Sequence, residues 1–268
     1  IVAGLAIPDV RERHTERQAE ADALHRRFWS PLDAAGDTDR DASDIAALYR
    51  LWRYLRTQRH ALSGNAFRRL CRDEYLNFLR VREWQDLTTQ LREVARELEL
   101  GDAGGAPRAA AGGPDAGSSA PTLRAGEQPV GPHGPDFDAI HLSVLSGLLS
   151  HVGLKDVREP RQQGPRRGRR PVAEYLGARG ARFAIQPGSA AAKAEPPLVM
   201  AVELVETTRL WARTVAPIRA EWVEDVGAHL VTRSYSEPRW SASAGQCVAT
   251  ERVTLLGVPI IADRQVSY

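Results

Sequence analysis

The residues best suited to chemistry lie between positions 175 and 213, where arginines alternate with small polar side chains. A guanidinium is a planar fork of N–H donors that matches phosphate oxygens, and hydroxyl and amide groups add neutral donors. Such a set is suited to holding a polyanion. Tyr175 and Trp211 could provide rings for stacking, although a tryptophan in an apolar strand often belongs to the core. The candidate residues are Arg179, Arg182, Gln186, Ser189, Thr207, Thr208, Arg209 and Arg213.

Other chemistries find less support in the sequence. Glu203 and Glu206 are three residues apart on a predicted strand, so they point to opposite faces and do not form an acid–base pair. His141 and His151 would lie about 15 Å apart along one helix, too far to share a metal ion. The chain also has no Gly-x-x-x-x-Gly-Lys-Ser/Thr loop and no Asp-Glu-Ala-His run. We therefore predict no catalytic residue and no metal site.

Short strands must position the candidate residues. Residues 182–185 alternate polar and apolar and stop at the turn signal Pro187-Gly188. Residues 199–204 and 209–218 are further extended, largely apolar runs. Strands this short, joined by tight loops, favour a small barrel over residues 172–232. Its mouth would carry Arg182 and Arg209.

Helical spacing dominates the first hundred residues. Ser43 is placed to cap a helix in which Ile45, Leu48, Trp52 and Leu55 share one face. Residues 65–98 fit either one long helix or two with a break near position 81. Within the segment 137–157, residues 137–152 return to helical spacing, with Gly153 as a stop. We expect residues 1–100 to form a helical bundle on which this last helix docks.

The remaining segments are of two kinds. Residues 101–136 consist largely of Gly, Ala, Pro and Ser, and residues 158–171 are rich in Arg, so both are predicted to be flexible insertions. Residues 233–268 predict a β-hairpin, 248–256 and 260–268, which looks cut off without a closing partner. The chain opens at Ile1 as if in the middle of a helix. The predicted class is α+β, with a helical bundle, a small OB-like β-barrel and a truncated β-hairpin region.

Several motifs then point to one family. They are Phe183-Ala-Ile-Gln-Pro-Gly-Ser189, Glu203-Leu-Val-Glu-Thr207, Ala21-Asp22-x-x-His25-x-x-Phe28, Leu62-Ser-Gly-Asn-Ala-Phe-Arg-Arg-Leu-Cys-Arg72 and Asn77-Phe-Leu-Arg-Val-Arg-Glu-Trp-Gln-Asp86. In this order they resemble the region of DEAH-box RNA helicases that follows the winged-helix domain, and are closest to the bacterial HrpA type. The resemblance implies a ratchet-like helicase-associated bundle, an oligonucleotide/oligosaccharide-binding (OB) barrel and the start of a family-specific C-terminal domain.

The same resemblance implies a function. The chain would be the RNA-binding C-terminal portion of an ATP-dependent helicase that guides single-stranded RNA, and alone it would need no cofactor and be inactive. ATP and Mg2+ would belong to the parent protein, whose ATPase domains would be partners together with ribosomes or RNA–protein complexes. The alternative is a non-enzymatic module that docks on a ribosome or a protein activator. Salt separates the two, because phosphate contacts weaken steeply as salt rises.

The amino-acid composition is consistent with an RNA-binding role but does not by itself indicate one. A formal net charge of +2 is too small to indicate a nucleic-acid binder by itself. Cys71 and Cys247 are far apart in apolar surroundings, which favours free thiols in a reducing cytoplasm. No apolar run approaches the roughly 20 residues of a membrane helix, so no membrane partner is expected.

Overall fold

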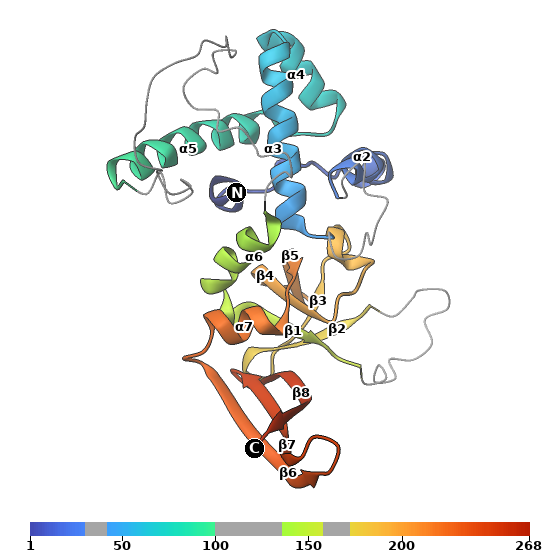
Figure 1. Cartoon of the computed structure of the whole chain (residues 1–268). Coiled ribbons are helices and arrows are strands. Elements are labelled where there is room, and N and C mark those ends of the chain that lie inside the picture. The colour runs from blue at the N-terminus through green and yellow to red at the C-terminus, as the bar shows by residue number, and fades with distance from the viewer. Residues whose placement is uncertain (30–41, 100–135, 158–171) are drawn as a thin grey trace, which may run out of the picture.

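The computed structural model describes residues 1–29, 42–99, 136–157 and 172–268. Helices occupy one end of the molecule, a barrel the middle and a β-sheet the other end, which confirms the α+β class (Figure 1). Residues 101–135 and 158–171, where we predicted flexible insertions, lie outside the described residues.

The helical end gathers around one apolar core. Its α-helices are α1 (Val2–Leu5), α2 (Gln18–His25), α3 (Asp44–Ala61), α4 (Gly64–Asp73) and α5 (Phe78–Glu97), and 3-10 turns over Thr15–Arg17 and Arg26–Phe28 flank α2. Leu55, Phe67 and Trp84 are almost fully buried in this core. In Figure 1, α5 runs across α3, so the arrangement is not a simple antiparallel bundle.

Side-chain caps fix where these helices begin. Ser43 Oγ accepts a hydrogen bond from the backbone N–H of Ala46 at 3.3 Å, as its position in the sequence predicted. Asn77 Oδ1 accepts one from Arg80 N at 3.0 Å and starts α5. The two-helix alternative for residues 65–98 is therefore confirmed, but the break lies at 74–77. Val81 is fully buried inside α5, and Tyr75, with a φ of 55°, follows the end of α4.

The barrel closes in the order β1-β2-β3-β5-β4. Its strands are β1 (Val152–Lys155), β2 (Glu174–Gly177), β3 (Arg182–Ile185), β4 (Leu198–Glu206) and β5 (Leu210–Pro217). Neighbouring strands are antiparallel except β3 and β5, which run parallel. The predicted strands correspond to β3, β4 and β5, whereas β1 and β2 were missed.

The helix predicted up to Val152 was too long. α6 (Phe137–Ser146) ends before Gly147, and after a 3-10 turn over Leu149–His151 the chain enters β1. Val152 is 1% exposed and pairs with Met200 of β4, so a distant strand satisfies backbone groups that a helix would have satisfied locally. The barrel therefore begins well before residue 172.

Aromatic rings fill the barrel where its strands approach closely. The rings of Tyr175 and Phe183 stack with centroids 5.7 Å apart, and a side chain at Gly153 would come within 2.2 Å of the Phe183 ring. Tyr175 is fully buried, and its hydroxyl donates to the Pro196 carbonyl at 2.9 Å. Burial raises the pKa of this phenol. Tyr175 is therefore a core residue, and its prediction as a stacking platform was wrong.

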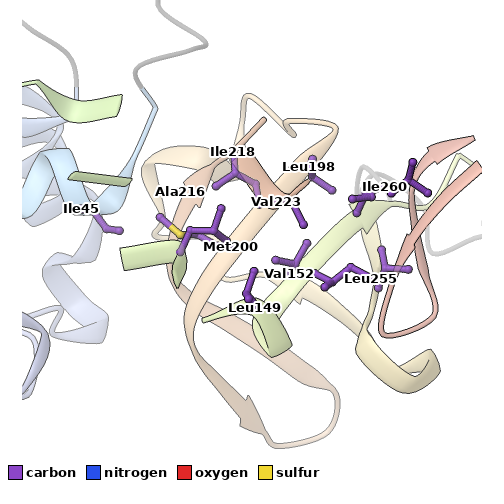
Figure 2. Packing of buried hydrophobic residues seen from close by; sticks show 13 residues of the cluster. Ile45, Leu149, Val152, Leu198, Met200, Ala216, Ile218, Val223, Leu255 and Ile260 are labelled. Carbon is purple, nitrogen blue, oxygen red and sulfur yellow. The ribbon is translucent and has the colours of Figure 1, made fainter. Parts of the chain in front are cut away.

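A shared apolar cluster joins the barrel to its neighbours (Figure 2). It reaches from Ile45 of α3 through Val152 and Met200 of the barrel to Val223 of α7 (Ala220–Val226). The cluster also includes Leu255, which belongs to a second sheet on the other side of the barrel from α3. That sheet comprises β6 (Val231–Ser241), β7 (Gln246–Leu255) and β8 (Val258–Ser267), all antiparallel. The predicted hairpin corresponds to β7 and β8, and β6 is the closing strand that sequence reasoning missed.

Candidate nucleic-acid interface

The predicted binding residues occupy two different ends of the barrel. Strands β3 and β5 are parallel, and Ala184 lies opposite Trp211. Arg182 precedes Ala184 by two residues and Arg209 precedes Trp211 by two residues, so the two arginines lie side by side. Thr207 and Thr208 form the exposed turn between β4 and β5 at this same end. We call this the open end of the barrel, with Arg182 and Arg209 as its basic pair.

Carboxylates hold the basic pair in place. Glu174 Oε1 accepts from Arg209 Nη2 at 2.7 Å, and its Oε2 lies 3.6 Å from Arg182 Nη1. Asp156 Oδ2 accepts from Arg182 Nη1 at 2.6 Å. Both guanidinium groups remain partly exposed, so these ion pairs orient them and contribute little to stability. They also neutralise part of the charge that a phosphate would meet.

The outer face of β5 continues from the basic pair. Arg209, Trp211 and Arg213 alternate with the buried Ala212 and therefore share one face of the strand. The Arg209 guanidinium lies 5.3 Å from the centroid of the Trp211 ring, which is half-buried. At a strand's usual rise these three residues span about 13 Å. Trp211 thus lies on the surface, where a base could reach it.

The other end of the barrel faces the helices, and we call it the closed end. Gln186, Ser189 and Arg213 line a cleft of about 810 Å³ between barrel and helices, with Arg11 and Arg13 on the opposite wall. Arg13 Nη2 donates to the Gly188 carbonyl at 2.9 Å and ties the two walls together. Gln186 therefore faces this cleft, away from the basic pair, and Arg213 ends the row on β5 that leads from the basic pair to the cleft.

Ser189 has a structural role at the closed end. Its side chain is only 5% exposed, and its Oγ accepts a hydrogen bond from Ala191 N at 3.1 Å, which caps the turn Ala190–Ala192. This geometry speaks against a direct contact between Ser189 and a ligand. Ser and Thr are preferred at such caps, and the sequence alone did not separate a capping role from a binding role.

Asp44 is a junction residue that sequence reasoning missed. One carboxylate oxygen accepts from Ala190 N and the other from Val215 N, both at 2.8 Å, so the first turn of α3 holds two segments of the barrel. Val215 follows Thr214, whose φ of 51° is unusual for a β-branched residue and interrupts the pairing of β4 with β5. The only signal in the sequence was an acidic residue after a helix cap.

Arg179 lies in the turn between β2 and β3, three residues before Arg182. It occupies the turn after β2 with a φ of 56°, and its backbone N–H donates to the Leu256 carbonyl at 2.9 Å. Leu256 belongs to the turn between β7 and β8, so this contact joins the barrel to the second sheet. The Arg179 side chain is exposed beside that junction.

Three further findings bound the chemistry. No cluster of His, Cys, Asp and Glu suited to a metal ion occurs among the described residues. Cys71 and Cys247 are both free thiols, and burial raises the pKa of Cys71 to about 11. Within the part of the chain that the structure places, no helix is both long and apolar enough to cross a bilayer.

Comparison with known proteins agrees with this geometry. Residues 140–230 match the family model described as oligonucleotide/oligosaccharide-binding (OB)-fold. The whole chain is 44% identical to the ATP-dependent RNA helicase HrpA of Escherichia coli and 41% identical to its homologue in Haemophilus influenzae. It spans 17% of the length of each relative. The chain is therefore homologous over all of its residues to HrpA-type ATP-dependent RNA helicases and contains an OB-fold barrel.

Proposed function

We propose that this chain is an RNA-binding portion of an ATP-dependent, HrpA-type RNA helicase and guides single-stranded RNA. The observation that carries the proposal is the basic pair, Arg182 and Arg209, which projects from neighbouring strands of an OB-fold barrel. In OB-folds the face around strands 2 and 3 and the loop between strands 4 and 5 bind oligonucleotides. Thr207, Thr208 and the basic pair occupy this place.

The strand of RNA would contact the barrel mainly through its backbone. Arg182 and Arg209 supply charge for phosphates, and the hydroxyls of Thr207 and Thr208 add donors in the turn. Trp211 offers a ring edge or face for a base, and Arg213 leads on toward the cleft that Gln186 also lines. Arg179 could contact a strand that leaves the open end. Backbone contacts of this kind read no sequence, which suits a helicase that moves along RNA.

ATP and Mg2+ would be held by the ATPase domains of the parent protein, which would be partners of this chain. The 268 residues contain no phosphate-binding loop, so residues 1–268 alone are expected to hydrolyse no ATP. A role in the cytoplasm is part of the same proposal, and the two free thiols support it.

The test measures affinity for a short single-stranded RNA over a range of salt concentrations. Arg182→Ala and Arg209→Ala should each weaken binding and reduce the slope of log affinity against log salt by about 0.7, the value for one lost phosphate contact on a single strand. Arg96→Ala on α5 removes an exposed arginine from the helical end and serves as the control for the loss of one positive charge.

Unchanged affinity and slope in both variants, with an intact circular-dichroism spectrum, would contradict an RNA site at the open end. That result would favour the alternative, a module that docks on a ribosome or protein activator. Equal losses in Arg96→Ala would instead indicate a diffuse attraction of the whole surface for RNA.

A further inference from the structure

The exposed aromatic side chains gather on the second sheet. Among the described residues, the exposed aromatic side chains are Tyr235, Trp240 and Tyr268, with exposed fractions of 49%, 70% and 68%. The tyrosines, tryptophans and phenylalanines of the helices and of the barrel are buried or half-buried wherever the structure places them. Large rings usually lose contact with water in a folded protein, so this concentration at one place calls for a reason.

Strand register puts the rings on one face. Tyr235 of β6 lies opposite Glu251 of β7, and Trp240 lies opposite Cys247. The Tyr268 backbone N–H donates to the Cys247 carbonyl from the other side of β7. Since positions 247 and 251 are an even number of residues apart, all three rings project to the same side. The rings of Tyr235 and Tyr268 approach to 5.7 Å between centroids.

Part of this face of the sheet is buried against the rest of the molecule. Val253 and Leu255 project to the same side of β7 and are buried against the barrel and α7. A cluster of charges closes the buried half: Arg264 donates to Glu224 of α7 at 2.7 Å and to Glu251 at 2.6 Å. The hydrogen bond from Arg264 lowers the pKa of Glu224. Beyond this cluster the same side of the sheet carries the exposed rings of Tyr235, Trp240 and Tyr268. We call these three rings the aromatic face.

The aromatic face exposes rings rather than aliphatic side chains. Over residues 230–268 the exposed large apolar side chains are these three rings and Leu230, which directly precedes β6. Stacking of a base requires the flat face of a ring, which an aliphatic side chain does not have. On the same face Arg233 and Arg264 lie in the charge cluster beside Tyr235, and both side chains retain contact with solvent. Rings interleaved with guanidinium groups are typical of surfaces on which unpaired bases stack.

The sheet also adjoins the proposed RNA site. The bond from Arg179 N to the Leu256 carbonyl joins the turn after β2 to the turn between β7 and β8, three residues from Arg182. In Figure 1 the sheet extends the molecule beyond the barrel, on the side opposite the helices. Tyr235 and Trp240 lie opposite Glu251 and Cys247, which are five and nine residues along β7 from this junction, or about 17 and 30 Å at the usual rise of a strand. An RNA must therefore span this distance to reach both surfaces.

We propose that the aromatic face binds unpaired RNA bases by stacking, as a second contact for the strand held at the open end of the barrel. The proposal rests on the proposed function. The two surfaces would bind RNA through different interactions: the basic pair through its charge and the aromatic face through ring stacking. Only an RNA long enough to reach both surfaces would engage the second one.

The experiment titrates a length series of oligouridines with the unaltered chain and with Trp240→Ala, Trp240→Leu and Trp240→Phe. For long RNAs the Ala and Leu variants should bind on the order of tenfold more weakly, since one stacked base is worth that much, whereas Phe should retain most of the affinity. The slope of log affinity against log salt should not change, because no phosphate contact is lost. The shortest RNAs should bind all four proteins equally.

Two further measurements complete the design. Long RNA should quench the fluorescence of Trp240 in the unaltered chain. This part of the quenching should be absent from Trp240→Phe, which lacks that tryptophan. Leu98→Ala removes an exposed apolar side chain from the helical end, where Leu98 is 63% exposed, and should leave binding unchanged at every length. Both side chains are exposed, so neither substitution should unfold the chain.

Three results would overturn the inference. The first is equal binding of long RNA by Trp240→Leu and Trp240→Phe, which would mean apolar contact without stacking. The second is unchanged binding by all Trp240 variants at every length while Arg209→Ala still weakens binding, in which case the barrel site stands and the aromatic face does not. A change in sedimentation without a change in RNA affinity would assign the face to contact between proteins.

Discussion

The two ends of the barrel use polar side chains for opposite purposes. At the open end, Arg182, Arg209 and Glu174 form ion pairs that remain in contact with water. At the closed end, Ser189 and Asp44 are almost fully buried, and their oxygens accept hydrogen bonds from backbone N–H groups. The first arrangement can exchange partners with a ligand, and the second cannot do so without breaking the fold.

This difference shows how a polar residue acquires its role. A partly exposed ion pair is worth little to stability, so its members are available for binding. A buried acceptor that satisfies backbone donors is costly to remove, because those donors lose their partner away from water. Binding and stability should therefore respond separately when residues of the two ends are changed.

The largest effect is expected for Asp44→Ala at the closed end. The substitution leaves the N–H groups of Ala190 and Val215 without an acceptor, and each loss costs about 1–3 kcal/mol. We expect the free energy of unfolding to fall by about 2–6 kcal/mol in a urea titration. Asp73→Ala, which removes an exposed carboxylate at the end of α4, is the control and should change stability by less than about 0.5 kcal/mol. Equal stability of the two variants would show that Asp44 does not anchor the barrel.

A smaller effect is expected for Ser189→Ala. Loss of the cap on Ala191 should cost about 1 kcal/mol of stability, the usual value for a hydroxyl cap. Affinity for short single-stranded RNA should stay unchanged, because the hydroxyl is buried and turned toward the backbone. The measurement is a urea titration paired with an RNA titration. A weakened RNA complex with unaltered stability would reverse the roles assigned to the two ends.

The smallest effect is expected for Glu174→Gln at the open end, and its sign is the informative part. Glu174 competes with phosphate for Arg182 and Arg209, so removing its charge should strengthen RNA binding by roughly two- to threefold, within the modest energy of an exposed ion pair. Glu97→Gln on α5 controls for the change in net charge. Weaker binding in Glu174→Gln would indicate that the carboxylate orients the arginines more than it competes for them.

Local patterns predicted the elements that are locally encoded. The alternation before Pro187-Gly188 placed β3 correctly, the Ser43 cap placed the start of α3, and the runs around positions 199–204 and 209–218 placed β4 and β5. β1 and β2 were missed because each has only four residues, too few for alternation to stand out. β6 was missed because most of its side chains are polar and exposed, so nothing in the pattern marks a buried face.

The sequence by itself determined which donors, charges and rings this protein has, that β3, β4, β5, β7 and β8 are strands, and which family it resembles. Only the tertiary structure decided which of those groups meet solvent. Asp44 accepts a bond from Val215, 171 residues away, and Arg182 meets Arg209 because two strands run parallel across a closed barrel. Burial and register depend on such distant partners, and no local pattern contains them. That is why one predicted set of binding residues separated into an exposed group and a structural one.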